Sequence, residues 1–342
     1  MRRLAGQRLA LIACLVILAA CGSDPGQSDQ PSSTESAPIP SPPSASGTGG
    51  DVEGALSLSL VATYDPDTIP GLDVLGYISV GPDGHLFVPN AGSSEMLELD
   101  GGTVVRRWGE AGTEAGQFGF LRDPEEPDSA LGGVAIAPDG TIYVVEAGNR
   151  RVQRFSAAGE SELTFGSSGD GDGQFIDPIG VALSPSSEVF IVDDARDDIQ
   201  VFSSDGEYLR TIGAQGSAPG ELLFAGNIRF SPYGELVNAD FGNSRVQAWG
   251  TDEVPLWTLG THGTGPGEFV EPQDVAFAAD GTMYVVDDSR VQAFDSQMNV
   301  IGVWPDGPSM GHLASIALDG DTLWVVAPYV DTLYEIRVSA TE

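Results

Sequence analysis

Residues 166–202 read GSSGDGDGQFIDPIGVALSPSSEVFIVDDARDDIQVF, and residues 260–294 repeat the pattern as GTHGTGPGEFVEPQDVAFAADGTMYVVDDSRVQAF. Residues 213–249, between them, keep the glycines, the strand-ending aspartate and a closing Arg-Val-Gln-Ala-Trp. The leading glycines of the three copies are spaced 47 residues apart. A fixed period of this length is typical of repeated supersecondary units, so the fold is derived from the repeat.

Each repeat consists of short β-rich runs separated by Gly, Asp and Asn. In the third unit these runs are residues 179–184, 188–193, 199–203 and 208–212. Runs of this length, bounded by turn residues and without helical periodicity, are typical of consecutive antiparallel strands. Four strands per unit predict a β-propeller, a ring of four-stranded sheets in which radial repetition leaves only short edges.

The turns between the first and second strands give the number of units. Six such turns occur, at Pro82-Asp-Gly84, Pro138-Asp-Gly140, Pro185-Ser-Ser187, Pro232-Tyr-Gly234, Ala279-Asp-Gly281 and Asp319-Gly320. The last unit ends after its third strand, residues 332–338, while an additional strand, residues 56–63, precedes the first unit. We therefore predict an all-β, six-bladed propeller of four-stranded antiparallel blades. The N-terminal strand completes the last blade, which removes an exposed edge.

The repeat signature resembles that of the NHL-repeat family. The shared pattern is Gly-x-x-Gly-x-x-x-Gly-x-Phe, Pro-x-x-Val-Ala, Pro-Asp-Gly-x-Ile-Tyr-Val and Asp/Glu-x-x-Asn-x-Arg-Val-Gln-x-Phe, and residues 109–155 follow it with one insertion. The resemblance spans residues 56–338, although Pro89-Asn90 and Ala327-Pro328 replace the acid in the first and last units. It implies a six-bladed propeller whose central channel can be purely structural.

Most of the signature is predicted to have structural roles. Acids at the end of the second strand should cap backbone N–H groups: Glu146, Asp193, Asp240 and Asp287. Arginines after the following turn should pair with these acids: Arg151, Arg245 and Arg290. Asn149 and Asn243 follow glycines and suit left-handed turn positions. Aromatic residues of the third strand should pack between blades: Phe155, Phe202, Trp249 and Phe294.

Residues 1–20 have the features of a signal peptide. Basic residues precede an apolar stretch, residues 9–20, that is too short for a permanent membrane span. The stretch ends in Leu18-Ala-Ala-Cys21, which resembles a bacterial lipobox and implies cleavage before Cys21 and lipidation of that cysteine. An ordinary secretory signal with an incidental cysteine is the alternative. Because Cys14 lies in the removed peptide, no disulfide or thiolate metal site is expected.

Residues 21–54 are rich in Ser, Pro and Gly and contain scarcely any large apolar side chain. Such a segment cannot bury enough surface to offset its chain entropy. We therefore expect a disordered tether between the lipidated Cys21 and a propeller domain, residues 55–342. This organisation predicts an extracytoplasmic protein, anchored to the bacterial cell membrane or envelope through the lipid on Cys21.

The charge of the chain is strongly negative. It has 15 basic residues against 50 acids and a formal net charge of −35. Nucleic acid is excluded as a partner because phosphate binding needs a basic face, and attachment to anionic lipid is disfavoured for the same reason. Repulsion between copies favours a soluble monomer. Binding of a cation or a basic partner is the alternative explanation of the charge.

The best site candidates are departures from the repeat at the channel mouth, where interblade linkers and second-to-third strand turns gather. An insertion after Phe118 adds an acidic, proline-containing loop, and loops in such positions often carry recognition. Its charged residues are candidate binding residues: Arg122, Asp123, Glu125, Glu126 and Asp128. A tolerated surface insertion is the alternative.

The innermost strands carry a second departure. Where units two and three have Gly133 and Gly180, the next three units carry oxygen-bearing side chains: Asn227, Asp274 and Ser315. We expect these to converge at the channel mouth, where oxygen ligands would suit Ca²⁺, with Asn227 and Asp274 as candidate metal ligands. A structural pair between Asp274 and Arg229 is the more usual arrangement of such residues, and Arg229 is a further candidate binding residue. No other cofactor is predicted.

Enzyme assignments find little support in the sequence. Its three histidines, His85, His262 and His312, occupy non-equivalent repeat positions, and no Ser/His/Asp set has a meaningful spacing. We therefore predict a membrane-anchored binding or scaffold module that recognises a protein or peptide of the cell envelope at the channel-mouth face. The alternative is a calcium-dependent hydrolase or lyase with its site in the central channel.

Overall fold

The computed structural model describes residues 56–122, 132–304 and 311–340. These residues belong to one structural unit, Ile39–Glu342. The predicted signal peptide, Cys21 and the tether lie outside the described residues, as do four residues of the insertion: Asp123, Glu125, Glu126 and Asp128. In the described ranges, no helix is both long and apolar enough to span a membrane.

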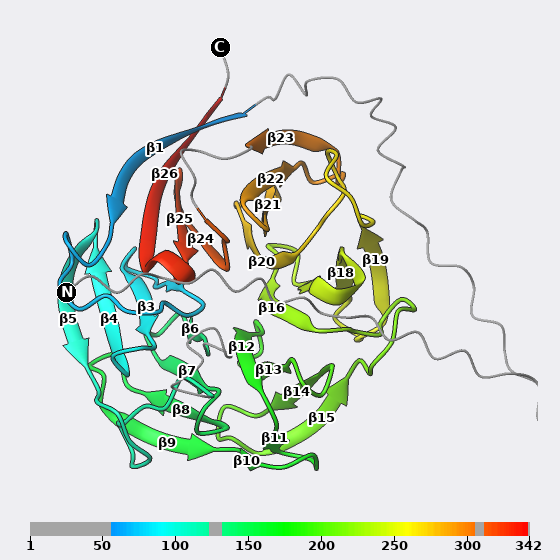
Figure 1. Ribbon diagram of the computed structural model, residues 1–342. Helices are drawn as coiled ribbons and strands as arrows, with labels where there is room; N and C mark the ends of the chain where they lie inside the picture. Colours follow the sequence, from blue (N-terminus) through cyan, green and yellow to red (C-terminus); the bar gives the residue numbers. More distant parts are fainter. Residues whose placement is uncertain (1–55, 123–131, 305–310, 341–342) are drawn as a thin grey trace, which may run out of the picture. The chain divides into compact units, whose positions relative to one another are not determined.

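Six four-stranded antiparallel sheets form the blades of a β-propeller (Figure 1). Blade 1 consists of β2 (Ser79–Val80), β3 (Leu86–Asn90), β4 (Glu95–Asp100) and β5 (Thr103–Trp108). Blade 2 consists of β6 (Val134–Ile136), β7 (Ile142–Glu146), β8 (Arg151–Phe155) and β9 (Ser161–Phe165). Blade 3 consists of β12 (Pro178–Leu183), β13 (Val189–Asp193), β14 (Asp198–Phe202) and β15 (Tyr208–Ile212), all within one residue of the predicted runs.

Blade 4 consists of β16 (Ala225–Phe230), β17 (Leu236–Asp240), β18 (Arg245–Trp249) and β19 (Pro255–Leu259). Blade 5 consists of β20 (Pro272–Phe277), β21 (Met283–Asp287), β22 (Arg290–Phe294) and β23 (Val300–Trp304). A small parallel ribbon of β10 (Ser167–Ser168) and β11 (Gln174–Phe175) lies in the linker before blade 3. Two 3₁₀ helices, η1 (Phe241–Asn243) and η2 (Pro328–Val330), follow the second strands of blades 4 and 6.

The two ends of the propeller meet in blade 6. Its strands follow the order β24 (Ser315–Asp319), β25 (Thr322–Ala327), β26 (Thr332–Ala340) and β1 (Leu56–Tyr64). β1 pairs antiparallel with β26 from Leu56 opposite Ala340 to Tyr64 opposite Leu333, and Figure 1 shows the two strands side by side. The predicted closure is therefore confirmed, and it covers an edge of β26 that would otherwise present unpaired backbone groups.

The apolar core lies between neighbouring blades. The second strands of blades 1 to 5 are buried at every position, whereas the outer strand β5 alternates between exposed and partly buried residues. The predicted interblade aromatics are all buried: Phe155, Phe202, Trp249 and Phe294. One cluster, for example, joins Tyr143 and Phe165 of blade 2 to Val181 and Ile191 of blade 3. Each blade is thus stabilised by burial against the next.

The signature acids hold the linkers in place, as predicted. Asp193 accepts hydrogen bonds from the backbone N–H groups of Ile176 and Asp177 at 2.8 and 2.9 Å. Asp240 is paired with Arg245 at 2.7 Å, and Arg245 also donates to three carbonyl groups of the preceding linker. Equivalent pairs join Glu146 to Arg151 and Asp287 to Arg290.

The prediction for the turn asparagines is wrong in one respect. The left-handed backbone conformation occurs one residue later, at Arg150 with φ 51° and at Ser244 with φ 50°. The side chains of Asn149 and Asn243 instead donate both to a linker carbonyl group and to the strand-ending acid. The asparagine is therefore a polar bridge between turn and linker, and its neighbour takes the turn conformation.

A disulfide across the closing strands tests the closure. Ser57 and Ser339 are direct partners, with their hydroxyl oxygens 2.8 Å apart, and opposed strand positions suit disulfide geometry. In a chain with Cys14→Ser and Cys21→Ser, we expect Ser57→Cys with Ser339→Cys to oxidise under mild conditions. The oxidised form should gain about 2–4 kcal/mol in free energy of unfolding, because the bond closes a very long loop. Urea unfolding with and without reductant measures the gain, and failure to oxidise would contradict the pairing.

Candidate functional site

Six residues occupy one equivalent position near the start of the innermost strands. The strand registers place Tyr77, Gly133, Gly180, Asn227, Asp274 and Ser315 there. Contacts link neighbouring members, from the bridge between Tyr77 and Gly133 to the hydrogen bond between Asp274 and Ser315. The predicted convergence of Asn227, Asp274 and Ser315 is thus present in the structure. Tyr77 was missed, although it stands where the next two units have glycine.

The six residues form a ring around the channel, and Asp274 is the centre of a buried hydrogen-bond network within it. Its carboxylate accepts hydrogen bonds from Asn227 Nδ2 at 3.0 Å, Arg229 Nη2 at 2.9 Å and Ser315 Oγ at 2.8 Å. Backbone N–H groups of Val275 and Ile316 donate to it at 2.8 and 3.1 Å. Asp274 and Ser315 are fully buried, and Asn227 is 1% exposed. Five donors, one of them charged, satisfy a buried carboxylate that would otherwise be costly.

Asp274 and Arg229 form a structural ion pair, which the other donors around Asp274 support. A hard cation at Asp274 would have to replace the guanidinium of Arg229, which also donates to the Ile78 carbonyl group at 2.7 Å. The network therefore links blades 4, 5 and 6 with the start of blade 1, and it fits the structural alternative better than a calcium site with Asn227 and Asp274 as ligands. Calcium binding there stays a prediction.

Removing the carboxylate of Asp274 distinguishes a structural ion pair from a calcium site. We expect Asp274→Ala to lower the free energy of unfolding by about 3–5 kcal/mol, because the largely buried Arg229 loses its charged partner. The additional change Arg229→Met should recover part of the loss. Urea unfolding in calcium and in chelator should give the same values. A calcium-dependent gain in stability that Asp274→Ala abolishes would instead identify a metal site.

The glycines of the ring make room for their larger neighbours. A Cβ atom on Gly133 would lie 3.3 Å from Cβ of Tyr77 and 2.9 Å from the carbonyl oxygen of Ile179. A Cβ atom on Gly180 would lie 2.2 Å from Asn227 Oδ1. Small residues in blades 2 and 3 are therefore needed because Tyr77 and Asn227 fill this side of the ring.

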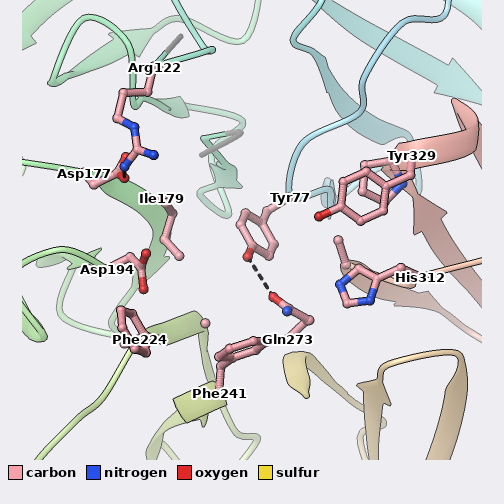
Figure 2. Close-up of a pocket in the computed structure, with 14 residues that line it drawn as sticks. Tyr77, Arg122, Asp177, Ile179, Asp194, Phe224, Phe241, Gln273, His312 and Tyr329 are labelled. Atoms are coloured by element: carbon pink, nitrogen blue, oxygen red, sulfur yellow. Dashed lines mark hydrogen bonds and ion pairs between the residues drawn. The ribbon is translucent and has the colours of Figure 1, made fainter. Parts of the chain in front are cut away.

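A cavity of about 270 Å³ lies directly above this ring, and we call it the mouth pocket. Its lining comes from interblade linkers, second-to-third strand turns and the first residues of inner strands. It includes Tyr77, Arg122, Asp177, Ile179, Asp194, Phe224, Phe241, Gln273, His312 and Tyr329. In Figure 2, Tyr77 lies in the middle of the view, with Asp177 and Asp194 on one side and His312 and Tyr329 on the other. The pocket thus lies on the predicted recognition face.

Two carboxylates give the mouth pocket its polar character. Arg122, from the insertion, forms an ion pair with Oδ2 of Asp177, whose side chain is only 2% exposed. Oδ1 of Asp177 is also buried and has no hydrogen-bond partner within the described ranges. Burial raises the pKa of Asp177 to about 6, even though Arg122 lowers it. Burial and the nearby charge of Asp177 raise the pKa of Asp194 to about 7.

Aromatic side chains form much of the remaining wall. Phe224 is 55% exposed at the rim and has a φ of 47°, a left-handed conformation that is strained for a bulky residue. Its backbone N–H donates to Oδ1 of Asp197 at 2.6 Å, whereas the equivalent N–H of Asp177 is held by the acid of its own blade. Blade 4 therefore presents an exposed aromatic ring at a position where the regular repeat does not require one.

A histidine and two carboxylates lie at the edge of the mouth pocket. His312 Nδ1 is 3.6 Å from both Glu271 Oε2 and Asp288 Oδ1. The three ligating atoms lie close enough together to hold a metal ion. His85 is in a similar group with Asp83 and Glu98, but on the turn between β2 and β3, at the other end of its blade. All of these side chains except His312 lie outside the mouth pocket lining.

The mouth pocket lies on the face that the sequence predicts, but few of its lining residues were predicted. Of the predicted binding residues that the structure describes, Arg122 lines the mouth pocket, while Asn227, Arg229, Asp274 and Ser315 form the network below it. Asp177, Asp194 and Phe224 were missed. The sequence feature that could have pointed to Asp194 is the stretch 193–198, which has more acidic residues than the equivalent turns of the other blades.

The pKa of Asp194 predicts the sign of a stability change. The folded protein holds this proton up to about pH 7, whereas an ordinary carboxyl group loses it near 3.8, so stability falls as the pH rises between these values. We expect Asp194→Asn to be more stable than the wild type at pH 8 by on the order of 1 kcal/mol, given the partial exposure of the side chain, and equal to it at pH 4.

Urea unfolding at the two pH values measures this difference. Asp280→Asn is the matched control, because a backbone hydrogen bond from Thr282 lowers the pKa of the exposed Asp280. Its loss should not stabilise the protein at pH 8. A less stable Asp194→Asn variant at pH 8 would contradict the assigned pKa.

Comparisons with known proteins agree with this fold. The model of the family DUF5128, described as a 6-bladed beta-propeller, matches residues 172–246. A comparison with curated protein sequences finds no match. Among solved structures, a catalytically inactive virginiamycin B lyase from Staphylococcus aureus with quinupristin is similar, with a TM-score of 0.56 and 12% identity over 82% of this chain and 99% of that one.

Two further structures show the same architecture. A gluconolactonase from Xanthomonas campestris has a TM-score of 0.59 and 15% identity over 78% of this chain and 86% of that one. The PQQ-bound aldose sugar dehydrogenase from Streptomyces coelicolor has a TM-score of 0.53 and 16% identity over 83% and 98%. At these identities the similarity concerns the fold alone. The chain is a six-bladed β-propeller of four-stranded antiparallel blades.

Proposed function

We propose that this protein is a binding or scaffold module of the NHL type that recognises a protein or peptide of the cell envelope at its channel mouth. A lipid on Cys21 would anchor it on the extracytoplasmic side of the membrane, as the lipobox-like sequence indicates. The observation that carries the proposal is the mouth pocket, whose buried Asp177 Oδ1 lacks a partner among the described residues. Unsatisfied buried polar groups with nearby aromatic walls are typical of ligand sites.

The pocket is made from departures from the repeat. Arg122 comes from the insertion, Tyr77 replaces a glycine of the ring, and Phe224 takes a strained conformation that blade closure does not need. Residues that only build blades, such as the buried acids of the second strands, keep their pattern in blades 2 to 5. This division supports a recognition role for the mouth, because strain and irregularity concentrate at functional sites.

The rim of the pocket supports a peptide or protein as the ligand. Phe224, Tyr329 and Val330 are 55%, 59% and 49% exposed, and Ile176, next to Asp177, is 38% exposed. Exposed apolar side chains around a polar centre are typical of interaction surfaces. A channel-based metal enzyme is less well supported, because the donors around Asp274 already satisfy its carboxylate.

Two exposed aromatic residues on opposite faces allow a matched test. Phe224 is at the mouth, and Tyr233, 61% exposed, lies on the turn between β16 and β17 at the other end of blade 4. Random peptides displayed on phage would be selected on the full-length protein in detergent. We expect the selected peptides to bind Phe224→Gly about tenfold more weakly or worse and Tyr233→Gly unchanged.

Folding of the variant is checked separately. Glycine accepts the left-handed φ of residue 224, so Phe224→Gly should keep or raise stability, by about 0.5–1 kcal/mol in urea unfolding. Weaker peptide binding by a more stable protein then reports the contact itself. Equal affinity for both variants, or no enrichment of any peptide, would contradict the proposed recognition face.

A further inference from the structure

We propose that the group held in the mouth pocket is an organic cation, the ammonium or guanidinium group of a basic peptide, seated against Asp177 and Asp194. This inference rests on the proposed function and specifies the chemistry of the ligand.

Blade 3 lacks an arginine that blades 2, 4 and 5 have in common. In blades 2, 4 and 5 the strand-ending acid is opposite an arginine, but in blade 3 Asp193 is opposite Asp198. The nearby Arg196 is bound to Asp198 at 2.8 Å. The turn that contributes Asp194 to the pocket therefore carries more negative than positive charge.

The carboxylates that face the pocket are incompletely paired. Arg122 satisfies only Oδ2 of Asp177, and Oδ1 is buried without a partner among the described residues. Asp194 has no hydrogen-bonded or ion-paired side-chain partner in the described part of the chain, and its backbone N–H donates to the Asp177 carbonyl group at 3.0 Å. Asp197, behind them, is already occupied by the Phe224 N–H and by Gln215 Nε2 at 2.7 Å.

A donor with positive charge would satisfy this arrangement. A cation stabilises both carboxylates in their charged form, which offsets the burial and the repulsion by neighbouring carboxylates that raise their pKa values. Charge-assisted hydrogen bonds of this kind are stronger than neutral ones. An anionic ligand would face two carboxylates, and Arg122, the one arginine of the described lining, is already bound to Asp177.

The remaining walls favour an organic cation over a metal ion. The rings of Tyr77, Phe224 and Phe241 line the same cavity, and aromatic rings attract ammonium and guanidinium groups. Calcium needs six to eight oxygen ligands, more than the carboxylates of Asp177 and Asp194 supply by themselves, and it gains nothing from aromatic walls. The volume of about 270 Å³ is at the small end for ligand pockets and suits one side chain or chain terminus.

Three small probes test the charge requirement on the full-length protein in detergent. They are the N-methylamides of acetyl-lysine, acetyl-arginine and acetyl-norleucine, the last being uncharged. Calorimetric titration is done at about pH 8, above the raised pKa values of both carboxyl groups. We expect one or both charged probes to bind at least about tenfold more tightly than the norleucine probe, and added salt to weaken their binding.

Conservative variants locate the interaction. Asp194→Asn and Asp177→Asn should each weaken the charged probes about tenfold and leave the norleucine probe unaffected, while Asp280→Asn, on the far face, should change nothing. Urea unfolding of each variant at the same pH verifies folding. A charged probe whose affinity is unchanged in Asp194→Asn would overturn the inference.

The outcome also distinguishes this inference from the proposed function. If no charged probe binds, and phage selection yields Phe224-dependent peptides without basic residues, the cation inference fails and the recognition face stands. If selection yields no Phe224-dependent peptide at all, the proposed function fails. Equal binding of the norleucine probe and the charged probes likewise overturns the cation inference.

Discussion

The structure depends on a buried acid at the end of the second strand in the regular blades. This carboxylate accepts backbone N–H groups of the incoming linker, as Asp193 does for Ile176 and Asp177. In blades 2, 4 and 5 an arginine neutralises the acid and donates to carbonyl groups of the same linker, and a glutamine such as Gln247 adds further bonds. Because these hydrogen bonds join the strand end to the linker, they fix the position of the linker at the channel mouth. The linkers at the channel mouth therefore keep their backbone positions, while side chains that do not take part in these bonds can differ between blades.

The residues at one inner-strand position differ between blades, and this difference produces the buried polar network around Asp274. Inner-strand positions that are glycine in two blades carry Asn227, Asp274 and Ser315 in three others, and these link blades 4, 5 and 6 through one carboxylate. Tyr77 occupies the same position in blade 1 and lines the mouth pocket. The polar centre thus links the blades, whereas in the mouth pocket Oδ1 of Asp177 has no hydrogen-bond partner among the described residues.

Blade 3 differs from blades 2, 4 and 5 at one repeat position that lies near the mouth pocket. Asp198 stands opposite Asp193 where the other regular blades have arginine, so the local charge is no longer balanced within the blade. Arg122, from the neighbouring insertion, supplies part of the balance through Asp177. A departure from the repeat can in this way leave carboxylate oxygens without a partner at the channel mouth and not disturb the strands, because the sheet hydrogen bonds do not depend on that side chain.

The sequence by itself determined the blade number, the strand positions of the third unit and the closure by residues 56–63, because a fixed period and short apolar runs recur in every repeat. It also identified the pairing of Asp240 with Arg245 and of Asp274 with Arg229. Only the tertiary structure decided that Asp177, Asp194 and Phe224 share one pocket with Tyr77. These residues are contributed by different blades, and whether a carboxylate is paired or left unsatisfied depends on neighbours that are distant in the chain. The left-handed conformation of Phe224 is likewise imposed by Asp197 of the preceding blade, which no local pattern reports.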